Sequence, residues 1–137
     1  MNIMNIEFNN DLTQIKSSAF KGSKLTGTLS IPSSVQSIGD YAFQDCSGIT
    51  MIILPEGNLT TIGQSAFSGC GIKHIYIPKS VTSIGDSVCD NCPNLTVVTL
   101  ELNDSGNVPT YQMMSVFVNI NNEIYLYVIG RSNINNN

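Results

Sequence analysis

Apolar residues recur along this chain at an interval of 23 residues. Two positions keep this interval, the first at Phe8, Ile31, Leu54, Ile77 and Leu100 and the second, two residues earlier, at Ile6, Leu29, Ile52, Ile75 and Val98. Insertions and deletions of one residue inside the intervening loops cancel before the next copy. A period of this length predicts a solenoid, in which each coil adds one short strand to a parallel sheet.

Each copy contains a short strand pattern. In the segment IKHIYIP, Ile75 and Ile77 are expected to point inward, while His74 and Tyr76 point outward. A proline follows three of these runs, at Pro32, Pro55 and Pro78. Because proline has no N–H to donate to a strand ladder, each strand is expected to end there.

A seven-residue phrase then repeats on what should be the outer side of each coil. It reads SIGDYAF at 37–43, TIGQSAF at 61–67 and SIGDSVC at 83–89. The glycine in each phrase, at Gly39, Gly63 and Gly85, suits a tight turn. The Ala-Phe pair that follows in the first two phrases can return to the core from a short helical segment. We therefore predict turns and short helical segments on this side.

The combined pattern, L-T-x-I-G-x-x-A-F-x-x-C-x-x-L-x-x-I-x-I-P, extends over roughly residues 3–100. It resembles the BspA-like, or Treponema pallidum-type, leucine-rich repeats. The resemblance implies a β-rich leucine-rich-repeat solenoid with a right-handed α/β-type coil and a parallel sheet on one face. The family includes surface antigens and adhesins of bacteria and parasitic protists, and it has no shared catalytic residues to carry over. It therefore implies a protein-binding role.

The first and last copies depart from this pattern. Lys16 replaces glycine, Ser23 replaces cysteine, Val88 replaces alanine and Cys89 replaces phenylalanine. Such degraded copies suit coils that face a cap more than another coil. Met1 falls almost on the first strand, so a longer parent chain with further repeats upstream is one expectation.

Beyond Leu100 the period ends. Two alternating runs, at 113–120 and 123–130, flank Asn121-Asn122 and predict a β-hairpin. Both faces of this hairpin are apolar, so we expect it to cap the last coil or to pair with another subunit as a homo-oligomer. We divide the chain into a solenoid of about four coils at 1–100 and, at 101–137, a loop plus hairpin cap with a flexible Asn-rich end.

Charge and hydropathy exclude several classes of protein. The net charge is −4 and only 12% of residues are charged, so there is no basic surface to attract nucleic acid. No apolar run reaches the length of a membrane span, and the first residues show no signal peptide. The resemblance favours the cell surface or secretion, whereas the missing signal favours the cytoplasm.

The four cysteines require a separate explanation. Cys46, Cys70 and Cys92 share one position of the repeat, and Cys89 occupies the phenylalanine position, so core packing accounts for all of them. We therefore predict neither a metal nor a cofactor. Half a zinc site or a redox pair at Cys89-x-x-Cys92 is the alternative. The single histidine, His74, stands without a recognisable nucleophile motif, so we expect no enzymatic activity.

Residues at the same outward strand position in successive copies should line up as columns across the sheet. These columns predict a binding surface. Exposed tyrosine among aliphatic residues is typical of an interaction patch, although isolated exposed apolar residues are also ordinary in strands. The predicted partner-binding residues are Met51, Ile53, Lys73, His74, Tyr76, Val97 and Thr99. The expected partner is a protein, with host matrix and cell-surface proteins as candidates. An intracellular leucine-rich-repeat scaffold is the alternative function.

Overall fold

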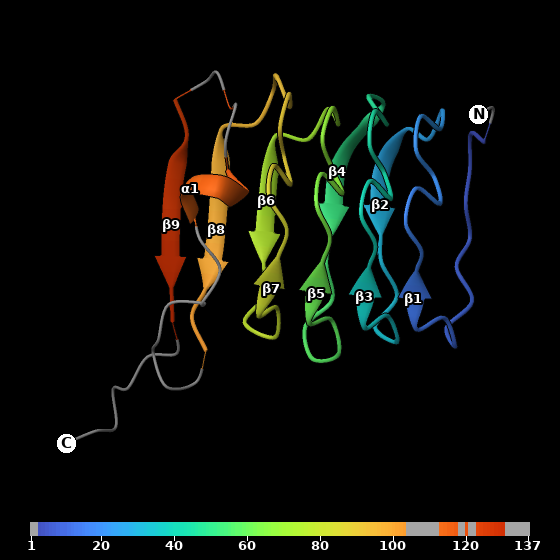
Figure 1. The fold of residues 1–137 in the computed structure, drawn as a ribbon, viewed down its shortest axis with the longest axis horizontal. Helices are drawn as coiled ribbons and strands as arrows, with labels where there is room; N and C mark the ends of the chain where they lie inside the picture. Colours follow the sequence, from blue (N-terminus) through green and yellow to red (C-terminus); the bar gives the residue numbers. More distant parts are fainter. Residues whose placement is uncertain (1–2, 104–112, 118–119, 121–122, 131–137) are drawn as a thin grey trace.

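Long strands line one side of a stack of coils, and short strands line the other side. The computed structural model describes residues 3–103, 113–117, 120 and 123–130. The long strands are β2 (Gly27–Ser30), β4 (Ile49–Ile53), β6 (His74–Ile77), β8 (Val97–Glu101) and β9 (Tyr125–Ile129). The two-residue strands are β1 (Gln14–Ile15), β3 (Ser37–Ile38), β5 (Thr61–Ile62) and β7 (Ser83–Ile84). The two sets point in opposite directions in Figure 1.

All strand pairs are parallel, as the solenoid prediction requires. On the short-strand side, β1, β3, β5 and β7 form one continuous sheet. On the long-strand side, β2 pairs with β4, and β6, β8 and β9 form a separate sheet. Leu29 lies opposite Ile52, and Ile75 lies opposite Val98, so strand neighbours are one 23-residue period apart.

The core fills the space between the two sides. Inward residues of the strands are buried, and the phenylalanine of each outer return stacks on its equivalent in the next coil. The Phe20 and Phe43 rings are stacked at 5.3 Å between centroids, and Phe43 and Phe67 at 5.9 Å. Stacked aromatic rings gain energy beyond the area that they bury. Cys89 occupies the next position of this column and is fully buried.

The repeated glycines have a different role from the predicted tight turn. A Cβ at Gly63 would lie 2.4 Å from the backbone nitrogen of Asp40 in the preceding coil. Similar clashes, at 2.4 Å and 2.3 Å, would arise at Gly39 and Gly85. These glycines therefore allow neighbouring coils to approach closely. The left-handed residues come two positions later, with φ between 52° and 59°, at Ser18, Tyr41, Ser65 and Ser87.

The outer returns are turns, and the described residues contain one short helix, α1 (Met113–Val116). This helix lies against the outer side of the last coil. The N–H of Ser87 donates to the carbonyl oxygen of Ser115 at 2.9 Å, and that of Val88 donates to Val116 at 3.0 Å. Val116 itself is 1% exposed, so α1 closes the outer side of the core.

The predicted C-terminal hairpin is wrong in the residues that the structure describes. The first of its two runs contains α1, and the second forms β9, which pairs with β8 in parallel. The tail thus adds an outer return and a long strand, as a further coil does. The physical reason is that the last coil leaves backbone N–H and C=O groups without partners at its outer return and at the edge of β8. A further coil, with a strand parallel to β8, provides hydrogen-bond partners on both sides. The expected turn at Asn121-Asn122 lies outside the described residues, and the domain division after Leu100 stays a prediction.

Candidate functional site

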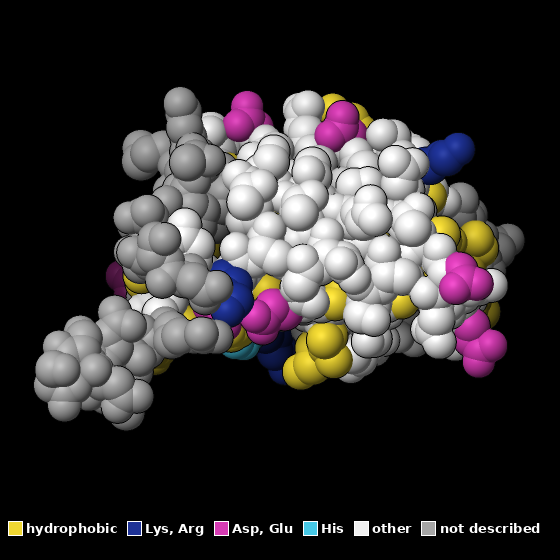
Figure 2. Space-filling view, turned by 90° about the horizontal axis from the view of Figure 1, so that it is seen from below, with side chains coloured by type: hydrophobic (Ala, Val, Ile, Leu, Met, Phe, Trp, Pro, Cys, Tyr) yellow, Lys and Arg dark blue, Asp and Glu magenta, His cyan; other side chains and the backbone are white. Residues whose placement is uncertain are grey.

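The outward side chains of the long strands form the open strand face of the solenoid. Thr28 lies opposite Met51 and Ser30 opposite Ile53. On the second sheet, His74 lies opposite Val97 and Tyr76 opposite Thr99. The predicted columns therefore exist within each sheet. Figure 2 shows hydrophobic side chains protruding at the lower margin of the molecule, beside a basic side chain and the histidine.

A groove opens in this face where the two sheets meet. No strand pairing joins β4 to β6, although their coils are paired on the opposite side through β5 and β7. The groove encloses about 440 Å³. It is lined by Thr28, Thr50, Met51, Ile52, Ile53, Leu54, Lys73, His74 and Tyr76. The interruption coincides with the shortened return at Gly71, which leads into β6.

The rim of the groove combines apolar side chains with one cation. Met51 is 52% exposed and Ile53 is 48% exposed, which is unusual for such large apolar side chains at neighbouring positions. Lys73 is exposed and is the only formally charged residue that lines the groove. An apolar surface with a few polar groups at its edge is the usual composition of a protein-binding patch.

Hydrogen bonds hold the two ring side chains of β6 in place. A ring nitrogen of His74 lies 2.9 Å from the hydroxyl oxygen of Thr99. The Tyr76 hydroxyl donates to Oε2 of Glu101 at the end of β8, at 2.5 Å. This hydrogen bond raises the pKa of Tyr76 to about 12, because ionised tyrosine could no longer donate to the carboxylate. The two rings are therefore fixed relative to β8.

Glu101 also connects to the loop that follows β6. Its Oε1 accepts a hydrogen bond from the backbone N–H of Lys79 at 3.2 Å. The ammonium group of Lys79 lies 3.4 Å from Oε1 of Glu56. The two carboxylates and Lys79 thus gather at the carboxyl ends of the strands, whereas Lys73 lies at their amino ends.

The groove brings together five of the seven predicted partner-binding residues. These are Met51, Ile53, Lys73, His74 and Tyr76. The other two lie on β8, where Val97 is half-buried and Thr99 is 7% exposed. Thr99 lies between Tyr76 of β6 and Tyr127 of β9 in the strand register, and the His74 ring is within hydrogen-bond distance of its hydroxyl group. Partner binding by all seven stays a prediction.

Sequence reasoning missed two residues of the same face. Tyr125 lies opposite Val97, and Tyr127 lies opposite Thr99, so both continue the columns onto β9. They are 72% and 55% exposed. Paired residues of β8 and β9 are 28 positions apart in the sequence instead of 23, so a fixed period of 23 residues does not lead to these tyrosines. The alternating pattern of YLYVI was the available signal.

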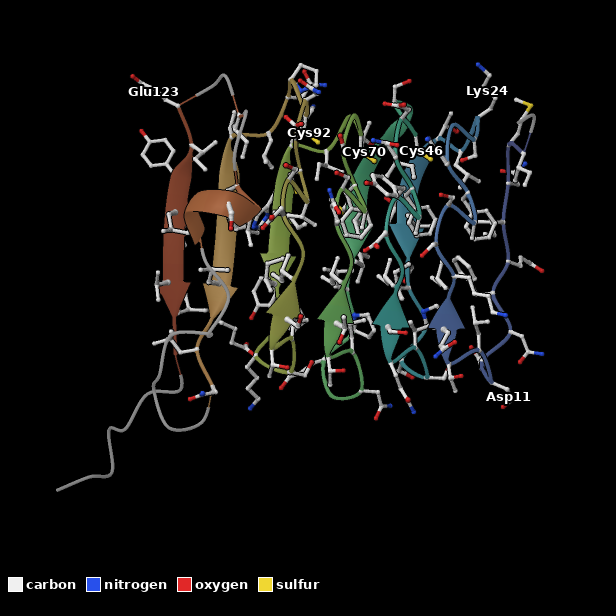
Figure 3. All side chains as sticks on the ribbon, in the orientation of Figure 1. Asp11, Lys24, Cys46, Cys70, Cys92 and Glu123 are labelled. Carbon is white, nitrogen blue, oxygen red and sulfur yellow. The ribbon has the colours of Figure 1, made fainter. Side chains whose placement is uncertain are left out.

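The cysteine column is a set of buried hydrogen-bond donors. The thiol of Cys70 lies 3.2 Å from the carbonyl oxygen of Phe43 in the preceding coil. Cys46 and Cys92 make the same contact with Phe20 and Phe67, at 3.1 Å and 3.2 Å. Figure 3 shows the three labelled cysteines in a row across neighbouring coils. A small side chain that can donate weakly to a carbonyl suits this position.

Burial raises the pKa of two of the four thiols and so lowers their reactivity as nucleophiles. Desolvation raises the pKa of Cys70 well above its ordinary value, and the charges of Cys92 and Cys46 act in the same direction. The pKa of Cys89 is also raised, chiefly by its hydrogen bond to Cys92 and by burial. The same hydrogen bond lowers the pKa of Cys92, whose side chain is only 2% exposed. All four cysteines are free. Among the described residues, no group of three or more His, Cys, Asp or Glu side chains could hold a metal ion.

Most of the chain matches a known family of repeat proteins. A family model for the BspA-type leucine-rich repeat region matches residues 1–103 in six copies. A comparison with curated proteins found no match. No helix in the described part of the chain is long and apolar enough to cross a membrane.

Several solved structures are similar. A leucine-rich cell surface protein from Faecalibacterium prausnitzii is 32% identical with a TM-score of 0.57, over 62% of this chain and 22% of that protein. The pneumococcal vaccine antigen PcpA is 14% identical with a TM-score of 0.54, over 84% and 43% of the two chains. A leucine-rich repeat protein from Treponema pallidum is 26% identical with a TM-score of 0.48, over 87% and 67%. This chain thus spans about a fifth of the first protein and less than half of the second.

Proposed function

Because this chain belongs to the BspA-type leucine-rich-repeat family, we propose that it is a recognition module that binds a partner protein through its strand face. The observation that carries this proposal is the groove between β4 and β6, with Met51 and Ile53 half-exposed at its rim. Contact with a partner would remove these apolar side chains from water. Lys73 at the amino end of β6 would favour a partner surface that carries a carboxylate.

The site of action that we propose is the cell surface, with a host matrix or cell-surface protein as partner. The likeness to the F. prausnitzii cell surface protein supports this location. The uncharged polar composition of the chain is compatible with it, since only 12% of residues are charged. In this role the module acts as an adhesin or antigen, or as part of one, by binding and not by catalysis.

A second candidate is an intracellular scaffold that uses the same strand face. The four unpaired thiols favour it, because cysteines in a reducing compartment stay free. The same thiols are buried and hydrogen-bonded, so they would also survive outside the cell. Location therefore distinguishes the two candidates, and the binding surface is common to both.

Surface exposure is the first experiment. Intact cells that express the protein at its native level are treated with protease and labelled with antibody, with a known cytosolic protein as the control for lysis. Digestion and labelling of the intact cells are expected. Full protection until the cells are opened would contradict the surface role and favour the scaffold.

Binding is then measured with purified matrix proteins, using surface plasmon resonance. Ile53→Asp places a charge on the groove rim and should weaken a true complex by at least about tenfold. Thr61→Asp is the matched control, because Thr61 is an exposed strand residue on the opposite side. Tyr76 is a poorer choice, since an aspartate there would lie beside Glu101 and destabilise the fold. Equal loss in both variants, or none in either, would contradict binding through the strand face.

A further inference from the structure

β9 ends the long-strand side with an edge that no described strand covers (Figure 1). All five of its side chains are exposed, from 40% at Ile129 to 72% at Tyr125. Natural sheets protect such edges with charges, prolines or bulges. The sequence of β9 is YLYVI, which has no charge and no proline, and its register with β8 is regular. This edge is therefore open to pairing with another strand.

The backbone groups that point to the free edge can be identified. The N–H of Tyr125 donates to Thr96 at 2.8 Å, and the carbonyl of Ile129 accepts from Leu102 at 2.7 Å. These odd-numbered residues therefore direct their backbone groups to β8. Successive residues of a strand direct these groups to opposite edges. Leu126 and Val128 consequently present their N–H and C=O groups on the free edge.

We propose that this edge pairs with β9 of a second copy of the chain, antiparallel and centred on Tyr127. In this register Leu126 of one copy lies opposite Val128 of the other, twice in each dimer. Both residues have their backbone groups on the free edge, so these positions form the hydrogen-bonded pairs of an antiparallel ladder. The register is self-complementary, as a twofold dimer requires.

Side-chain packing favours the same register. Leu126 and Val128 lie opposite the buried Val98 and Leu100, so they occupy core-facing positions. They are nevertheless 50% and 51% exposed, because no described residue packs over them as a further coil would. In the dimer each covers the other across the twofold axis. On the open face Tyr127 meets its own counterpart and Tyr125 meets Ile129, which are favourable cross-strand pairs.

The two faces of β9 select the antiparallel direction. An antiparallel dimer with its twofold axis perpendicular to the sheet keeps Leu126 and Val128 of both copies on the core-facing side. A parallel pairing of the same two edges would place these side chains on the side of the partner strand's open face, with Tyr127.

The dimer leaves the groove between β4 and β6 uncovered, because that groove lies two strands away from β9. The inference therefore does not depend on the proposed function. It adds that two strand faces would be presented side by side, so that a partner with repeated sites would bind with avidity.

Sedimentation equilibrium of the 137-residue chain tests the proposal over a range of protein concentrations. We expect a reversible dimer. Tyr127→Lys and Tyr127→Glu each set like charges together at the twofold axis, so each should weaken dimerisation by about tenfold at low salt, and an equimolar mixture of the two variants should restore it. Lys24→Glu is the control, because Lys24 is exposed in the first coil, at the other end of the solenoid (Figure 3).

Three outcomes would overturn the proposal: a monomer at all concentrations, longer polymers, or a dimer that neither Tyr127 variant weakens. Hydrogen exchange gives an independent measurement on the same samples. The amides of Leu126 and Val128 should become protected only as the dimer forms. Protection of these amides in the monomer would show that the chain covers its own edge, and this would also overturn the proposal.

Discussion

The hydroxyl of Tyr76 donates a hydrogen bond to the carboxylate of Glu101, one coil further along the solenoid. The contact joins β6 to the end of β8 and fixes the tyrosine ring at the edge of the groove. Because Glu101 also accepts the backbone N–H of Lys79, one carboxylate organises the carboxyl ends of two strands. The hydrogen bond to Glu101 thus holds the Tyr76 ring in place in the protein without a bound partner.

This hydrogen bond predicts a loss of stability in alkali. The pKa of Tyr76 is raised to about 12 in the folded protein, above the ordinary value of 10.0, so folding favours the protonated hydroxyl. Its contribution is complete below pH 10 and is lost as the pH rises through about 12. In Tyr76→Phe this loss should be absent. Unfolding by urea at several alkaline pH values would measure the difference between the two proteins.

A tyrosinate absorbance titration provides the control for that prediction. The difference between wild type and Tyr76→Phe should show one group that titrates near pH 12, and Glu101→Gln should move it toward 10.0. A difference spectrum that titrates at the ordinary value in the wild type would contradict the contact between Tyr76 and Glu101.

Gly63→Ala should be among the most destabilising single substitutions in the chain. Its Cβ would meet the backbone of Asp40 at 2.4 Å, so the two coils would have to separate. We expect a loss of about 3 kcal/mol or more in the free energy of unfolding. Gly57→Ala is the matched control. Gly57 has a φ of 109° but no atom near its Cβ position, and should lose about 1 kcal/mol. Because Gly63 has no positive φ, a loss at Gly63 no larger than that at Gly57 would contradict the close approach of the two coils.

The thiol of Cys70 should contribute as a hydrogen-bond donor as well as by its volume. Cys70→Ala removes the donor to Phe43 and leaves a small cavity, which should cost about 2 kcal/mol in urea unfolding. Cys70→Ser keeps a donor, and Ser23 occupies the same position in the first coil at 3% exposure. The serine variant should therefore be the more stable of the two. The reverse order would reduce the role of Cys70 to apolar filling.

All four thiols should be unreactive in the folded protein. Burial raises the pKa of Cys70, and each of the four side chains is 2% exposed or less. A disulfide reagent should modify four thiols only after denaturation. Rapid modification of native protein, or zinc in the purified chain by mass spectrometry, would revive the metal or redox interpretation of Cys89 and Cys92.

The sequence predicted the coil, the direction of the side chains from β2 to β8 and the columns of the open face, although no strand forms at the first predicted position, residues 6–8. These features follow from a local alternation of period two combined with a 23-residue translation, both of which are visible in one chain. The pairs Leu29 with Ile52 and His74 with Val97 confirm them. Five predicted binding residues consequently met in one groove.

Other features depended on contacts between coils. The alternation at 125–129 is the same for a parallel and an antiparallel strand, so the sequence could not choose between a hairpin and one more coil. The structure contains one more coil because the backbone N–H groups of Ser87 and Val88 and the edge of β8 need hydrogen-bond partners, which the tail provides. The glycine of each phrase likewise looked like a turn residue until the distance to the preceding coil was known.

The sequence by itself therefore determined the repeat and which residues face the core, because both depend on spacing along one strand. Only the tertiary structure decided where the sheet is interrupted, which edge stays open and why each glycine and cysteine is needed. Those properties depend on the separation of backbones in neighbouring coils, and residues 22 to 28 positions apart set that separation together.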